Sequence, residues 1–144
     1  MDKLEYIPGD LAFHYIPKTI IKKYVKVYVC STQNALSLED MDGNLYDYIG
    51  ELYQIPLTPE ILEKNGWKKE AMSRGISGRH WVYTKPDIEE YGYFPIYIEK
   101  GIGDEFDVYP FTDNNVCKQI AYIKYVHQLQ HLLFGLGLNS EMEV

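Results

Sequence analysis

Two histidines four residues apart, His127 and His131 in the segment HQLQH, have the spacing that places two imidazoles on one face of a helix. Zinc hydrolases use this spacing with a glutamate beside the first histidine, where this chain has Gln128. A zinc site also needs a third ligand, and no residue nearby in the sequence supplies one. On a helical wheel both histidines lie beside Lys124. We therefore expect them to face solvent, with a metal site at His127 and His131 as the alternative.

A glycine-bearing basic segment, residues 68–80, is the second place where chemistry could occur. Backbone amides in a glycine-rich turn, together with guanidinium groups, favour the binding of anions. The candidate ligand-binding residues are Lys68, Arg74, Arg79, His80 and Trp81, with Trp81 or a tyrosine available to stack on a base. The segment lacks the GxxxxGK[ST] pattern of nucleotide-binding loops, and no helix is expected to start after it. We interpret it as a charged hairpin loop, and binding of a small anion or nucleotide is the alternative.

Three carboxylates, Asp104, Glu105 and Asp107, lie next to the turn sequence GIGD. Acid–base or metal chemistry would require them to sit in different environments at fixed distances, and the calcium-loop pattern is absent. We expect them on a turn and on the outer face of a strand. The sequence also lacks a serine nucleophile elbow, the glycines of a dinucleotide-binding fold and the histidine–cysteine set of deaminases. No cofactor is expected, and a non-enzymatic protein is favoured.

The composition indicates a soluble globular protein. With 144 residues, 46% of them hydrophobic and 24% charged, the chain has the length and mixture of one domain over residues 1–144. The net charge of −7 works against attraction to nucleic acid and to anionic lipid. The chain has 14 tyrosines, which suit half-buried strands and also recognition surfaces.

The two cysteines, Cys30 and Cys117, lie in apolar runs without CxxC spacing and are expected to be free thiols. The first residues do not resemble a secretion signal, and no apolar run is long enough to span a bilayer. We expect a cytoplasmic protein.

The spacing of apolar residues predicts mostly strands. Residues 22–31 alternate, with Val25 and Val27 on one face and Tyr24 and Tyr28 on the other. Strands are also predicted at 9–16, 45–55, 67–71, 79–84, 93–99, 105–110 and 116–122, and residues 35–44 are predicted to be loop and turn because of the Asp-Gly pair at 42–43.

Two helices are predicted. In the first, Thr58 caps the amino end, Pro59 takes the first helical position and Gly66 ends the helix. The second covers residues 124–136, with an apolar stripe formed by Tyr122, Val126, Leu129, Leu133 and Leu136, widened by Tyr125 and Leu132. The fold class expected is α+β, a bent antiparallel sheet with a short central helix and a longer C-terminal helix packed on it. Residues 9–55 are expected to curl into an SH3-like partial barrel.

Two segments, IPLTPEILEKNG at 55–66 and IKYVHQLQ at 123–130, resemble a family of small uncharacterised proteins from Bacteroidetes, their prophages and conjugative elements. The two motifs cover about a quarter of the chain. The resemblance implies a mobile-element setting and no particular activity or site residue. Both segments are explained physically as a capped helix and a helix with an apolar face.

These observations lead to three functional hypotheses. The first is a non-enzymatic accessory protein of a phage or mobile element that binds a host or element protein through a tyrosine-rich acidic surface. The second is a small-ligand or nucleotide-binding protein that sequesters its ligand. The third, nucleic-acid binding by the segment 68–80, is disfavoured by the net charge. No membrane association is expected, and a homodimer is plausible because of the wide apolar helix face.

Overall fold

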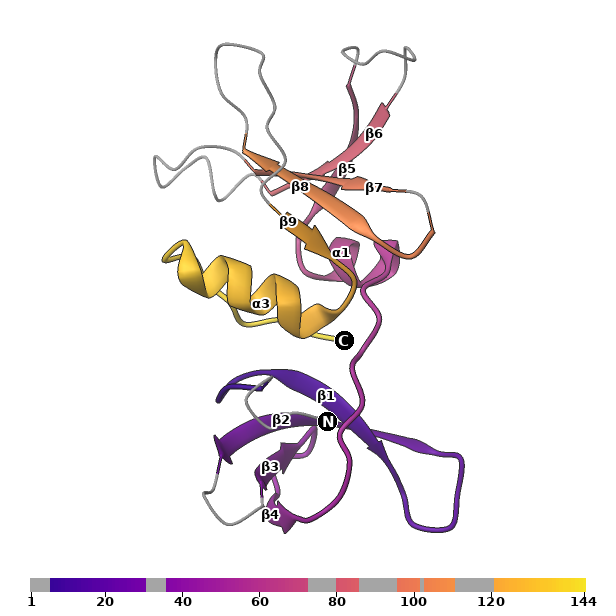
Figure 1. Ribbon diagram of the computed structural model, residues 1–144, viewed down its shortest axis with the longest axis vertical. Helices are drawn as coiled ribbons and strands as arrows, with labels where there is room; N and C mark the ends of the chain where they lie inside the picture. The colour runs from indigo at the N-terminus through magenta and orange to yellow at the C-terminus, as the bar shows by residue number, and fades with distance from the viewer. Residues whose placement is uncertain (1–5, 31–35, 73–79, 86–95, 102, 111–120) are drawn as a thin grey trace. The chain divides into compact units, whose positions relative to one another are not determined.

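The computed structural model of the chain describes residues 6–30, 36–72, 80–85, 96–101, 103–110 and 121–144 (Figure 1). These residues form two antiparallel sheets, of four and five strands, and two helices, which is an α+β fold. The sequence predicted one bent sheet. The strands are closely spaced along the chain, and nothing in their spacing shows that the series is divided into two sheets.

The chain divides into two compact units. Unit 1 contains Met1–Pro56 and Tyr125–Met142, and unit 2 contains Leu57–Lys124 and Glu143–Val144. Each unit has its own sheet and helix. The expectation of a single domain over residues 1–144 stays a prediction.

Unit 1 is a four-stranded meander in the order β1-β2-β3-β4, accompanied by one helix. Its elements are β1 (Leu11–Tyr15), β2 (Lys22–Cys30), β3 (Leu36–Asp40), β4 (Leu45–Tyr48) and α3 (Val126–Gly135). The alternation predicted for β2 is confirmed, because Val25 and Val27 are fully buried whereas Tyr24 and Tyr28 are exposed. Burying one face of the strand removes its valines from water and stabilises the sheet.

The expectation of a loop over residues 35–44 is wrong for its first half. Leu36 and Leu38 are buried in β3, which pairs with both β2 and β4. The short alternation of leucines with Ser37 and Glu39 is a strand pattern that the nearby Asp-Gly pair obscured. The turn itself is where the sequence placed it, since Gly43 has a φ of +86° between β3 and β4.

The strand predicted for residues 45–55 ends at Tyr48, and the chain then returns to the free edge of β1. Phe13 and Tyr53 form an isolated antiparallel bridge there, with N···O distances of 3.0 and 2.8 Å. The four-stranded sheet is therefore curled toward its own first strand, but it is not closed among the described residues. The core inside the curl contains Tyr6, Ala12, Val25, Val27, Leu36, Leu38 and Leu52.

Unit 2 is a five-stranded meander in the order β5-β6-β7-β8-β9 that follows a short helix. Its elements are α1 (Pro59–Lys64), β5 (Lys68–Met72), β6 (His80–Thr84), β7 (Ile96–Lys100), β8 (Phe106–Pro110) and β9 (Ala121–Ile123). The predicted turn and outer-face position of the three carboxylates is consistent with this sheet. Asp104 and Glu105 are exposed between β7 and β8, and Asp107 is half-buried on β8.

Helix α1 forms as its sequence predicts. The Thr58 hydroxyl accepts a hydrogen bond from the Ile61 N–H at 3.2 Å, and Pro59 occupies the first turn. Gly66 adopts a left-handed φ of +87°, which lets the Trp67 N–H donate to the Leu62 carbonyl at 3.0 Å. Trp67 and Leu62 are both buried, so the end of α1 joins the core of unit 2.

Helix α3 is shorter than predicted, and its buried face is wider. Val126, Leu129 and Leu133 are buried as expected, whereas Tyr122 belongs to β9 and is exposed, and Leu136 is the exposed C-cap. His127 and Gln130 are buried as well. Neither helix of the described chain combines the length and the apolar character needed to cross a membrane.

Candidate functional site

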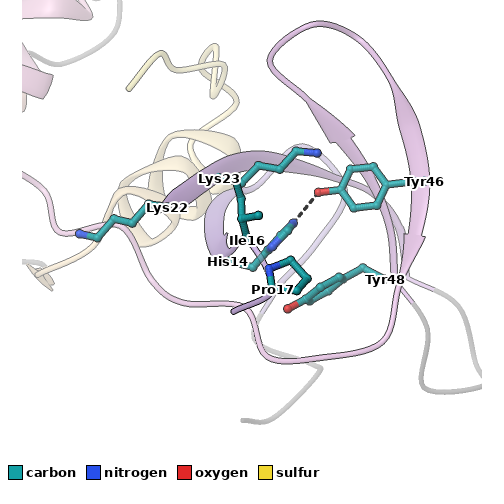
Figure 2. Close-up of a pocket in the computed structure, with 7 residues that line it drawn as sticks. All are labelled: His14, Ile16, Pro17, Lys22, Lys23, Tyr46 and Tyr48. Atoms are coloured by element: carbon teal, nitrogen blue, oxygen red, sulfur yellow. Dashed lines mark hydrogen bonds between the residues drawn. The ribbon is translucent and has the colours of Figure 1, made fainter. Parts of the chain in front are cut away.

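A hollow of about 540 Å³ lies at one end of the curled sheet of unit 1 (Figure 2). We call it the hollow and define it by its lining residues, His14, Ile16, Pro17, Lys22, Lys23, Tyr46 and Tyr48. They come from β1, from the turn that follows it, from the start of β2 and from β4.

The register of the strands explains why polar and aromatic side chains meet in the hollow. Cross-strand partners share a face of a sheet, and His14 is paired with Lys23 two positions beyond the buried pair of Ala12 and Val25. The tyrosines of β4 are likewise paired with the buried leucines of β3, Tyr46 with Leu38. The hollow is therefore the end of the core face, where buried aliphatic residues give way to histidine, lysine and tyrosine.

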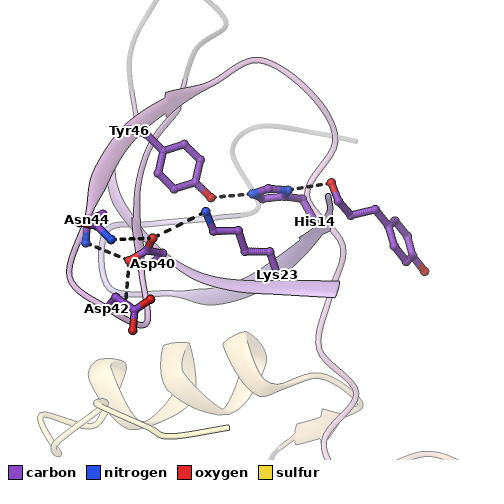
Figure 3. A network of polar contacts seen from close by, with 7 residues as sticks. His14, Lys23, Asp40, Asp42, Asn44 and Tyr46 are labelled. Carbon is purple, nitrogen blue, oxygen red and sulfur yellow. Dashed lines mark hydrogen bonds and ion pairs between the residues drawn. The ribbon is translucent and has the colours of Figure 1, made fainter. Parts of the chain in front are cut away.

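Both nitrogens of the buried His14 ring are engaged (Figure 3). Nδ1 lies 3.0 Å from the Tyr15 carbonyl oxygen, which can only accept, so Nδ1 carries a proton. Nε2 lies 2.6 Å from the Tyr46 hydroxyl, which donates to it when the ring is neutral. Tyr48 stacks on the imidazole with ring centroids 4.3 Å apart. His14 is thus a fixed wall of the hollow.

Lys23 contacts both Tyr46, the partner of His14, and Asp40 at the turn between β3 and β4. Its Nζ lies 4.5 Å from the ring centroid of Tyr46 and 3.6 Å from Oδ2 of Asp40, and Figure 3 marks the ion pair with Asp40. The Asp40 carboxylate accepts hydrogen bonds from the backbone N–H groups of Asp42 at 3.0 Å and Asn44 at 2.9 Å. The backbone hydrogen bond from Asn44 is the largest of the effects that hold the pKa of Asp40 below its ordinary value. Burial, followed by the charge of Asp40, raises the pKa of Tyr46.

Asp40 should make the stability of unit 1 sensitive to acid. Because its pKa is lower in the folded protein, its hydrogen bonds stabilise the fold above the ordinary aspartate pKa, and this contribution is lost as the pH falls through the folded pKa. We expect the urea midpoint to fall between pH 5 and pH 2 less steeply in Asp40→Asn than in the wild type. Asp42→Asn is the control, because it removes a carboxylate from the same turn while leaving the Asp40 contacts in place. Equal slopes for wild type and Asp40→Asn would contradict this account.

Five of the seven residues that line the hollow lie in a basic segment that the sequence motifs did not indicate. Residues 11–38 contain four lysines and no aspartate or glutamate, although the whole chain has a net charge of −7. The lysines are Lys18, Lys22, Lys23 and Lys26. A count of charge along the sequence would have found this segment. The lining of the hollow contains two lysines and no acidic residue, whereas the sequence predicted a tyrosine-rich acidic binding surface.

Aromatic side chains also gather on the outer face of β1 and β2. Phe13 stacks on Tyr53 with centroids 5.4 Å apart and packs edge-on against Tyr15 and Tyr24. Lys22 covers this cluster, with Nζ 4.7 Å from the Phe13 ring centroid. In Figure 2 the Lys22 side chain extends away from His14, so its ammonium group points out of the hollow.

No family model, curated protein or solved structure matches this chain. The resemblance to a family of small proteins from Bacteroidetes, their prophages and conjugative elements stays a prediction.

The ligand-binding residues predicted from the sequence are only partly described. Lys68 is exposed at the start of β5, and His80 and Trp81 lie on β6, but nothing of the latter two side chains is described. Arg74 and Arg79 lie outside the described residues, as does Cys117, and the Cys30 side chain is likewise not described. In the β5–β6 ladder Lys68 is paired with Thr84, and His80 is paired with Met72. These two pairs are four positions apart along the strands, so the backbones of Lys68 and His80 are separated by about 13 Å along the strand direction. An anion site there stays a prediction.

The expectation that both helix histidines face solvent is wrong for His127. His127 is buried, with its ring 5.0 Å from that of Tyr6, whereas His131 is partly exposed. The reason is that the segment before β1 packs on this side of α3 and widens its buried face. The ring centroids of His127 and His131 lie 5.6 Å apart. Among the described residues there is no group of three histidine, cysteine, aspartate or glutamate side chains that could hold a metal ion.

His131 and Gln130 instead attach α3 to the start of β1. His131 Nε2 lies 2.6 Å from Oδ2 of the buried Asp10, which also accepts the Ile7 N–H at 2.8 Å. The Gln130 amide accepts from the Leu11 N–H at 2.9 Å and donates to the carbonyl oxygens of Gly9 at 3.0 Å and Ser140 at 3.2 Å. Histidine and glutamine at this place have a structural role in unit 1.

Proposed function

We propose that the protein is a non-enzymatic accessory protein of a phage or mobile element, which binds a host or element protein through the hollow of unit 1. The observation that carries this proposal is the continuity of the hollow with exposed apolar residues. Ile16 lines the hollow, and Ile20 and Ile21 follow in the same β1–β2 connection with 92% and 58% of their surface exposed. Aliphatic side chains grouped in this way on a surface are typical of a protein-binding site.

The curl of unit 1 supports this reading. We infer an SH3-like partial barrel, because β1 pairs with β2 along one edge and meets the segment after β4 at Phe13 and Tyr53 on the other. SH3 domains bind extended segments in grooves lined by aromatic residues. Tyr46 and Tyr48 give the hollow such a lining.

The contacts of His14 support binding over proton transfer. A general base needs a free nitrogen within reach of its substrate, whereas the His14 ring is held by Tyr15, Tyr46 and Tyr48. The setting in a phage or mobile element is supported by the two sequence segments that resemble that family. Those segments contain all of α1 with its caps and the first half of α3, so they say nothing about the partner.

Site-specific photo-crosslinking in host cells tests the proposal. A photo-reactive phenylalanine analogue replaces Ile20 in the β1–β2 connection, which supplies Ile16 and Pro17 to the hollow, or, as a matched control, Tyr122 in unit 2, which is 66% exposed. Neither residue belongs to a core, so both variants should fold. We expect a discrete protein adduct from position 20 and none from position 122. Adducts from position 122 alone, or from neither position, would contradict the proposal, and absence at both is also what a hollow for a small anion or nucleotide would give.

A further inference from the structure

The lysines of the basic segment indicate the chemistry of the bound partner. Lys18, Lys22, Lys23 and Lys26 all lie on the β1–β2 hairpin, and no acidic residue occurs from residue 11 to residue 38. These lysines form a positively charged cluster on a chain whose net charge is negative. The local positive potential attracts carboxylates and guides their approach.

Two of these lysines are available to a partner. Lys23 already contacts Asp40 at 3.6 Å. Lys22 is exposed and its ammonium group lies over the ring of Phe13, and no acidic residue of the described chain lies within ion-pair distance of it. Lys18 is exposed at the tip of the hairpin. Among the described residues, Lys18 and Lys22 thus have no acidic partner, so both ammonium groups can pair with carboxylates of another molecule.

The backbone at Lys18 gives a second, independent observation. Lys18 has a φ of +62°, the only described residue other than glycine with a positive φ. The turn is held by the Thr19 N–H and hydroxyl, which both donate to the Ile16 carbonyl, at 3.0 and 2.8 Å. Glycine adopts this conformation without strain, whereas a residue with a Cβ does not. A strained lysine at the rim of a hollow is expected where its side chain is used.

We propose that the hollow and its lysines bind an acidic peptide segment of the partner protein. An apolar side chain of the segment enters the hollow against Tyr48 and Ile16, and flanking aspartate or glutamate carboxylates contact Lys18 and Lys22. This inference rests on the proposed function and names the chemistry of its partner. A peptide fits better than a nucleic acid, because isoleucines lie beside the lysines and the remainder of the chain repels a long polyanion.

The test measures fluorescence anisotropy with the full-length protein and defined probes. The first probe is a labelled dodecapeptide in which glutamate alternates with leucine and tyrosine, and the second has glutamine in place of every glutamate. An oligothymidylate of equal length is the third. We expect the glutamate peptide to bind about tenfold more tightly than the glutamine peptide, and its affinity to fall with added salt. Equal binding of the two peptides, or tighter binding of the oligothymidylate, would overturn the inference.

Variants assign the binding to the rim of the hollow. Lys22→Glu should weaken binding of the glutamate peptide about tenfold, since it replaces attraction by repulsion. Lys18→Gly should weaken it about threefold while raising the urea midpoint, because the strain is relieved. Lys68→Glu is the matched control, an exposed lysine in the basic segment 68–80, and should bind as the wild type does. Loss of binding in Lys68→Glu alone would overturn the inference.

The two proposals fail separately. Crosslinked protein at position 20 without binding of the glutamate peptide would overturn the acidic-peptide inference and leave the proposed function in place. Absence of crosslinked protein together with absence of peptide binding would remove both.

Discussion

Leu129→Ala is expected to lower the free energy of unfolding by about 2–5 kcal/mol. Leu129 is fully buried in α3, between the equally buried Val126 and Leu133. Removing its isobutyl group loses the transfer free energy of the buried atoms and leaves a cavity that the surrounding strands and helix fill only in part. Urea unfolding followed by circular dichroism gives the change directly.

Phe134→Ala is the matched control for this prediction. Phe134 is also a large apolar residue of α3, but 66% of its surface is exposed. Its loss should change the free energy of unfolding by no more than about 0.5 kcal/mol. If the two variants lost similar stability, the buried face of α3 described above would be incorrect.

Asp10→Ala is expected to cost about 2–4 kcal/mol, the second large effect. The buried carboxylate accepts from the Ile7 N–H and from His131 Nε2, and its removal leaves both groups without their acceptor. Part of the His131 ring is exposed, so water can replace one of these hydrogen bonds. The measurement is again the free energy of unfolding in urea.

A double-mutant cycle isolates the contact between Asp10 and His131. We expect His131→Ala to cost less than Asp10→Ala, and the double variant to be more stable than the sum of the two changes predicts by about 0.5–3 kcal/mol. Strict additivity would show that the 2.6 Å contact does not contribute to stability.

Local patterns in the sequence predicted the elements that depend on neighbouring residues. The alternation over β2 and the cap formed by Thr58, Pro59 and Gly66 are properties of short stretches, and both are confirmed. β3 was missed because its five residues adjoin a strong turn signal. The burial of His127 depends on the segment before β1, more than a hundred residues away, which no helical wheel includes.

The hollow could not be predicted for the same reason. His14 and Tyr46 are 32 positions apart and meet only because β1 and β4 belong to one curled sheet. The lysines beside them were visible in the sequence as a segment with no acidic residue. The sequence instead predicts a site at residues 68–80, because glycine, arginine and histidine occur there within a short stretch.

The central claim is that the hollow of unit 1 is the binding surface of this protein, and amide chemical shifts test it most directly. The unlabelled glutamate peptide is titrated into the full-length, ¹⁵N-labelled protein. The account predicts that the largest shift changes fall on His14, Lys18, Lys22, Tyr46 and Tyr48, and that Lys68 and its neighbours on β5 stay unchanged. Shift changes concentrated on β5 and β6, with the signals of the hollow unmoved, would contradict it.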